Sequence, residues 1–187
     1  MDTFSHIKVV IGIILSLSIA HLLKGTVKIV EHPKRYKPYA VHLLWALYTF
    51  LLLIHYWWWE IRLKDVTSWN FIEYFFIILY IILYYALCVL LFPDDLQEYE
   101  GYEDYFYSRK KWFFLVMAII FAGDFIDTLI KGKVYAAHLG WEYPVRNIVH
   151  IILCVVAAYT RNKRFHTILV WLFLLYELSW ILRFYNR

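Results

Sequence analysis

Charged residues are scarce in this 187-residue chain. Asp, Glu, Lys and Arg make up 18% of it, whereas hydrophobic residues make up 63% and the mean hydropathy is +0.55. A water-soluble domain is usually about 45–50% apolar, because polar residues must cover its surface. A bilayer removes that requirement, since the outside of a membrane protein can be as apolar as its inside. The scarcity of charge therefore argues against a water-soluble fold.

Cysteine is also scarce, and metal or redox motifs are missing. The two cysteines, Cys88 and Cys154, each lie inside an apolar run, and no Cys-x-x-Cys or His-Glu-x-x-His sequence occurs. A redox pair and a thiolate or zinc site are therefore not indicated, and we interpret both cysteines as buried apolar side chains. The basic residues form no stripe, so nucleic acid is not an expected partner. We expect no metal and no cofactor.

Long apolar runs are what the sequence has in abundance. They cover residues 7–23, 41–59, 71–92, 112–130, 145–159 and 166–182. Most are close to the roughly 20 residues that a helix needs to cross a bilayer. They are continuous and do not alternate, which favours helices over the strands of a barrel. We therefore predict an all-α, polytopic membrane protein, in which residues 1–187 form one bundle of six transmembrane helices.

Basic residues between the runs predict an orientation. The side reached after the first, third and fifth runs carries Lys24, Lys28, Lys34, Arg35, Lys37, Arg109, Lys110, Lys111, Arg161, Lys163 and Arg164. The other side carries Lys8, Arg62, Lys64, Lys131, Lys133, Arg146, Arg183 and Arg187. Eleven against eight places the first side in the cytoplasm by the positive-inside rule, with both termini outside a cell membrane.

The two halves of the chain show a weak internal sequence similarity. Lys24-Gly25 closes the first run and Lys131-Gly132 closes the fourth. A proline and then a histidine follow each, at Pro38 and His42 and at Pro144 and His150. The similarity suggests a 3+3 inverted repeat, as in many transporters, although Lys-Gly is also ordinary chemistry for the end of a helix.

Ionisable residues inside the apolar runs are the candidate site, because each costs about 2.5–3.5 kcal/mol on insertion scales. The set comprises Glu60, Glu73, Asp124, Asp127, Glu177, Arg146, His55 and His150. The second, fourth and sixth predicted helices end on the side that carries the termini, and the third and fifth begin there. We therefore expect the whole set to lie in one half of the membrane.

A structural interpretation and a functional one are both open for this set. In the structural one, Arg146 pairs with Asp124 or Asp127 and fixes two helices together. That pairing leaves Glu177 without a cationic partner, which favours a protonated carboxyl, a bound cation or a water-filled cavity. We therefore predict a channel or small transporter for protons or small cations, with Asp124, Asp127 and Glu177 as the site. A chain this small is expected to form a homo-oligomer in the bilayer.

Other functions stay open. A membrane-embedded enzyme acting on a lipid or isoprenoid would use the same acids together with neighbouring aromatics, although we favour a non-enzyme. Those aromatics are Trp45, Tyr48, Tyr56, Tyr74, Tyr80, Tyr84 and Tyr85. A sensory or defence-type effector would work through protein partners at the acidic segment 93–106. Haem fits poorly, because His42 and His55 are thirteen residues apart and thus about 140° apart around a helix.

Overall fold

The structure, a computed structural model, describes residues 3–185 and contains only helices in that range. The helices are α1 (Thr3–Glu31), α2 (Ala40–Trp59), the 3-10 helix η1 (Glu60–Asp65), α3 (Phe71–Leu91), α4 (Tyr102–Ile130), α5 (Lys133–His138), α6 (Glu142–Tyr159) and α7 (Lys163–Tyr185). The predicted all-α class is therefore confirmed. Arg187, which entered the count of basic residues, lies outside the described residues.

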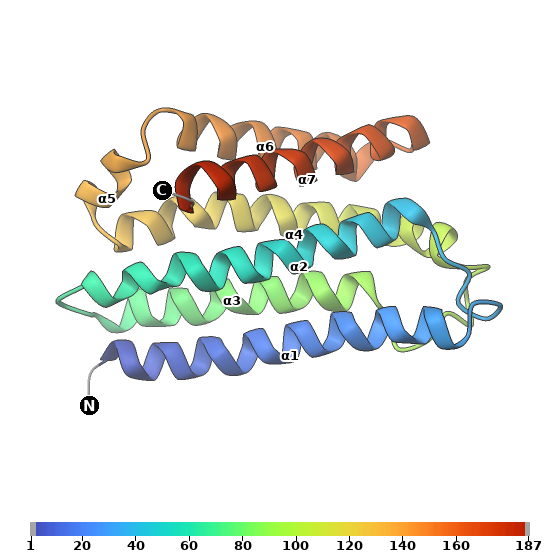
Figure 1. Ribbon diagram of the computed structural model, residues 1–187, viewed down its shortest axis with the longest axis horizontal. Helices are drawn as coiled ribbons and strands as arrows, with labels where there is room; N and C mark the ends of the chain where they lie inside the picture. Colours follow the sequence, from blue (N-terminus) through green and yellow to red (C-terminus); the bar gives the residue numbers. More distant parts are fainter. Residues whose placement is uncertain (1–2, 186–187) are drawn as a thin grey trace.

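Six helices run along one common axis, and α5 is a short helix between α4 and α6 (Figure 1). The start of α1 and the end of α7 lie at the same end of the bundle, together with η1 and α5 (Figure 1). We call this the terminal end. The opposite end, which we call the loop end, carries the α1–α2, α3–α4 and α6–α7 connections.

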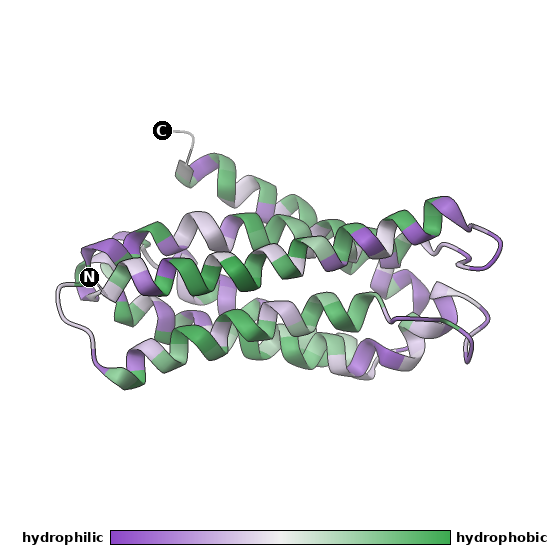
Figure 2. Cartoon of the chain, turned by 90° about the horizontal axis from the view of Figure 1, so that it is seen from below, coloured by the Kyte–Doolittle hydropathy of each residue, from purple (hydrophilic) through white to green (hydrophobic). Residues whose placement is uncertain are grey.

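Five helical segments of the described chain are long and apolar enough to cross a membrane, namely α1, α2 with η1, α3, α4 and α7. Hydrophobic residues dominate the middle of the bundle, and hydrophilic residues gather toward its ends (Figure 2). The helix α6 lies beside the others but is not among the five, since Glu142, Arg146 and His150 make its first half polar. The fold is that of a polytopic helical membrane protein, and the sixth span stays a prediction.

Helix α4 begins at Tyr102, ten residues before the predicted start. The extra turns form because Tyr102, Tyr105 and Phe106 repeat at helical spacing and are buried on one face. The short helix α5 was not predicted, since its six residues bury nothing and so leave no periodic signal.

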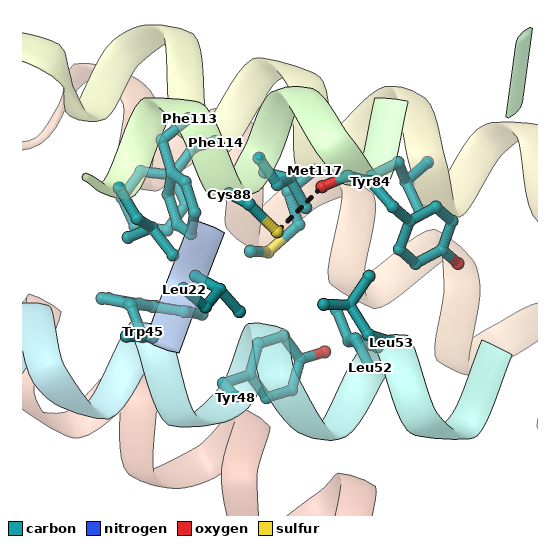
Figure 3. Packing of buried hydrophobic residues seen from close by; sticks show 14 of the residues in the cluster. Leu22, Trp45, Tyr48, Leu52, Leu53, Tyr84, Cys88, Phe113, Phe114 and Met117 are labelled. Carbon is teal, nitrogen blue, oxygen red and sulfur yellow. Dashed lines mark hydrogen bonds between the residues drawn. The ribbon is translucent and has the colours of Figure 1, made fainter. Parts of the chain in front are cut away.

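A predominantly aromatic core fills the middle of the bundle. Trp45, Tyr48 and Phe114 are fully buried, and the Trp45 ring of α2 packs edge-on against both Tyr48 of the same helix and Phe114 of α4 (Figure 3). Both cysteines are buried, and the Cys88 thiol donates to the Tyr84 carbonyl oxygen at 3.2 Å. Their interpretation as small apolar side chains agrees with this environment.

The two halves of the chain pack differently. Helix α1 packs most extensively against α3, whereas its counterpart α4 packs most extensively against α6. The α1–α3 contact is close at Gly25, where an added Cβ would lie 2.1 Å from Cγ of Phe92. The inverted repeat stays a prediction.

Candidate functional site

Helix direction brings the ionisable residues of four helices together at the terminal end. Helices α2, α4 and α7 run toward this end, and α6 starts from it (Figure 1). His55, Asp124 and Glu177 therefore lie in the last part of their helices, and Arg146 lies in the first part of α6. The expectation of a shared layer agrees with the geometry of these four helices.

Glu177 is the centre of a first cluster. Its carboxylate is 0% exposed and binds Nη2 of Arg146 at 2.9 Å through one oxygen, while the other oxygen binds Nδ1 of His55. The guanidinium carbon of Arg146 lies 4.7 Å from the ring centre of Trp180, which adds a cation–π contact. One buried acid thus joins α2, α6 and α7.

Lys131 is the centre of a second cluster. Its ammonium donates to Oε1 of Glu60 at 2.8 Å and to Oδ2 of Asp127 at 2.5 Å, and its side chain is 0% exposed. It also lies 5.4 Å from the ring centre of Trp59. Burial acts to lower the pKa of this ammonium, but the carboxylates of Asp127 and Glu60 outweigh it, so the pKa is raised. The cluster links η1 to the end of α4.

Asp124 lies between the two clusters. Its Oδ2 accepts from Nδ2 of Asn147 at 2.7 Å, and its carbonyl oxygen accepts from the Tyr143 hydroxyl at 2.8 Å. Tyr143 is also 2.7 Å from the hydroxyl of Thr128. These bonds fix the last turns of α4 against α6. No cation is hydrogen-bonded to the Asp124 carboxylate within the described chain.

A cavity of about 30 Å³ lies between α2, α3, α4 and α6 at the terminal end. It has room for about two water molecules. Its wall includes Asp124. It also includes His55 and Arg146, the two residues that bind Glu177. The remaining wall residues are hydrophobic or aromatic: Leu52, Tyr56, Trp59, Tyr80, Tyr84, Ile120 and Phe121. Glu177 itself lies behind His55 and Arg146.

Charge does not balance in this layer. Four carboxylates, those of Glu60, Asp124, Asp127 and Glu177, face two permanent cations, Arg146 and Lys131. The second oxygen of Glu60 is buried without a hydrogen-bond partner among the described residues. An uncompensated charge is very costly in a low-dielectric medium, so this excess of acids is the unusual feature of the layer.

Two interpretations from the sequence are wrong. Arg146 pairs with Glu177 and not with Asp124 or Asp127, so Glu177 does have a cationic partner. Glu60, which follows the second predicted run directly, is buried and shares Lys131 with Asp127. Sequence reasoning missed Lys131 because it placed that residue in a loop, although its spacing of four from Asp127 is a helical ion-pair signal.

The other two predicted site residues lie apart from the carboxylate clusters. Nδ1 of His150 donates to the Arg146 carbonyl oxygen at 2.7 Å, and its ring packs on Phe121 and Phe173. Glu73 forms a capping box with Asn70 at the start of α3. His150 therefore supports the backbone of Arg146, whereas Glu73 caps the start of α3.

Comparison of the chain with protein-family models, with curated proteins and with solved structures found no match.

The rim of the site carries a second pair of side chains. Nη1 and Nη2 of Arg183 donate to the Glu142 carboxylate, at 2.7 and 2.5 Å, and the Tyr176 hydroxyl donates to it at 2.8 Å. Arg183 and Arg146 both lie near the Trp180 ring. The Trp180 indole thus lies close to both the exposed Arg183–Glu142 ion pair and the buried Arg146–Glu177 ion pair.

Proposed function

We propose that this membrane protein transfers protons through the terminal-end half of its bundle. Asp124, Asp127 and Glu177 are the proton-binding acids in this proposal, and His55 is the base next to Glu177. The excess of carboxylates over the cations Arg146 and Lys131 at the terminal end carries the proposal, because protons on the acids or on His55 neutralise that excess with the least structural change.

The cavity supplies the connection that such transfer needs. Its wall includes Asp124 and His55, and its volume suits water molecules that pass protons between them. Tyr56 and Tyr84 add hydroxyl groups to the same wall, and the Tyr56 hydroxyl has no hydrogen-bond partner among residues 3–185. Arg146 and Lys131 hold the neighbouring carboxylates in place, and His150 positions Arg146 through its carbonyl oxygen.

Protons are favoured over metal cations by the position of Lys131. Its ammonium already occupies the space between Glu60 and Asp127, where a cation bound by both carboxylates would lie. An enzyme acting on a lipid is less well supported. The cavity of about 30 Å³ is far smaller than the roughly 300–1,000 Å³ of usual ligand pockets.

The test is proton flux in liposomes that contain the purified protein and an enclosed pH-sensitive dye. We expect an imposed pH gradient to collapse faster with the wild-type protein than in empty liposomes. Asp124→Asn is the main variant, because Asp124 is only half-buried and its bond to Asn147 can persist in part. It should lower the flux about tenfold or more, since general acid–base groups contribute about 100-fold or more.

Glu73→Gln is the matched control, because Glu73 is an acid of the same end that lies outside both clusters. It should leave the flux unchanged. The proposal fails if the wild-type protein is no faster than empty liposomes, or if Asp124→Asn and Glu73→Gln conduct equally well.

A further inference from the structure

The loop end has a corner where the start of α4 meets the end of α6 and the α6–α7 connection. Lys110 fixes this corner, since its ammonium donates to the carbonyl oxygens of Ala157 at 3.1 Å and Ala158 at 2.7 Å. The contact satisfies carbonyls that the end of α6 leaves free. We call the following six residues the basic corner: Arg109, Lys110, Lys111, Arg161, Lys163 and Arg164.

Three members of the basic corner have partners inside the protein. Lys110 binds the end of α6, as described. Arg109 donates to the Tyr99 hydroxyl at 2.9 Å, and Lys163 forms an ion pair with Glu103. These three charges hold the corner together and are only partly available to other groups.

The other three, Lys111, Arg161 and Arg164, are exposed, and the described residues offer none of them an ion pair. The ammonium of Lys111 lies 5.5 Å from the ring centre of Tyr159, which holds it beside the α6 end. Arg161 lies on the wall of an open groove of about 300 Å³, together with Ser108, Lys163 and one acid, Asp104. Three exposed cations without an ion pair among the described residues therefore belong to this corner.

Two aromatic side chains give the depth of this corner in the membrane. Trp112 is 57% exposed at the point where the apolar part of α4 begins, and Tyr159 is 66% exposed at the last residue of α6. Exposed tryptophan and tyrosine at the ends of apolar helices are typical of the headgroup region. Lys111 is next to Trp112 in the chain, so its charge lies at the same level.

We propose that the basic corner binds the headgroups of acidic phospholipids, with Lys111, Arg161 and Arg164 as the phosphate-binding residues. The charge is complementary, the three cations form no ion pair with residues 3–185, and the aromatic residues set them at headgroup depth. Lysine and arginine donors suit phosphate oxygens. This proposal is independent of proton transfer. It implies that the loop end faces the leaflet that is richer in acidic lipid.

The test is native mass spectrometry of the purified full-length chain with added phosphatidylglycerol or phosphatidylcholine. The wild-type protein should retain phosphatidylglycerol in preference, and the preference should fall as salt is raised, because exposed charges are screened. The triple variant Lys111→Gln/Arg161→Gln/Arg164→Gln should bind phosphatidylglycerol about tenfold more weakly or worse, since each basic residue near an acidic surface contributes about fivefold.

The matched control is Arg62→Gln/Lys64→Gln/Lys133→Gln, which removes the same charge from exposed positions of the terminal end. It should retain phosphatidylglycerol as the wild-type protein does. Equal losses in the two triple variants would overturn the proposal, and so would equal retention of both lipids by the wild-type chain. The lipid preference of the wild-type protein and its salt dependence decide the question even if a variant does not fold.

Discussion

Two histidines of α2 have opposite surroundings at the two ends of the bundle. His55, at the terminal end, binds the carboxylate of Glu177. His42, near the loop end, is 1% exposed and stacks on Tyr102 with 4.6 Å between the ring centres. Within the described part of the chain neither ring nitrogen of His42 has a hydrogen-bond partner, and the Phe92 ring stands edge-on to the imidazole at 5.2 Å. The same residue type is part of an ionic cluster in one place and of an aromatic cage in the other.

The difference extends beyond these two residues. The buried carboxylates all lie at the terminal end, whereas Lys110 of the loop end is buried against backbone carbonyls. His166, also at the loop end, donates to the Thr160 carbonyl oxygen and packs on Phe106 and Phe114. Buried acids are thus concentrated at one end of the described bundle, and packing and surface charge characterise the other.

The largest effect should come from removing the acid that joins three helices. Glu177→Gln leaves Arg146 buried without a balancing charge, and a guanidinium cannot lose its proton to escape. We expect the free energy of unfolding to fall by about 3–5 kcal/mol, measured by denaturation in detergent micelles. Glu142→Gln is the control, because its ion pair with Arg183 is exposed and should contribute less than about 1 kcal/mol. Similar losses in the two variants would mean that Glu177 is not effectively buried.

A smaller and pH-dependent effect is expected at Lys131. Lys131→Met removes the cation between Glu60 and Asp127, so two carboxylates repel each other in a buried site. Protonation relieves that repulsion, and the variant should therefore lose stability as the pH rises. We expect a loss of about 3 kcal/mol at pH 8 and about 1 kcal/mol at pH 5 relative to the wild type. A loss that is the same at both pH values would show that the two acids do not interact.

Much of this contrast follows from periodicity and helix direction. The apolar runs define the helices, and alternating direction places Asp124, Glu177 and Arg146 at one end, because both statements depend on spacing along the chain alone. The pairing of Arg146 with Glu177 does not follow from spacing along the chain. Whether Arg146 binds Asp124 or Glu177 depends on the rotation of α6 and α7 about their axes, and both acids are within reach in an ideal bundle.

The aromatic cage was still harder to predict. His42 and Tyr102 are sixty residues apart in the chain, and Tyr102 belongs to turns of α4 that the apolar run 112–130 does not include. Lys131 was missed for a related reason, since a lysine next to glycine resembles a helix end in water. Long-range packing, and not local preference, decides both positions.

The smallest effect distinguishes the two histidines directly. His55→Phe removes a hydrogen bond to a charged group, which should cost about 1.5–3 kcal/mol of the free energy of unfolding. His42→Phe removes no hydrogen bond and places one ring among others, so it should cost less than about 1.5 kcal/mol. Denaturation of both variants in the same detergent measures the difference. If His42→Phe lowers the free energy of unfolding more than His55→Phe does, the nitrogens of His42 make stabilising polar contacts. The surroundings of His42 would then not be held together by aromatic packing alone.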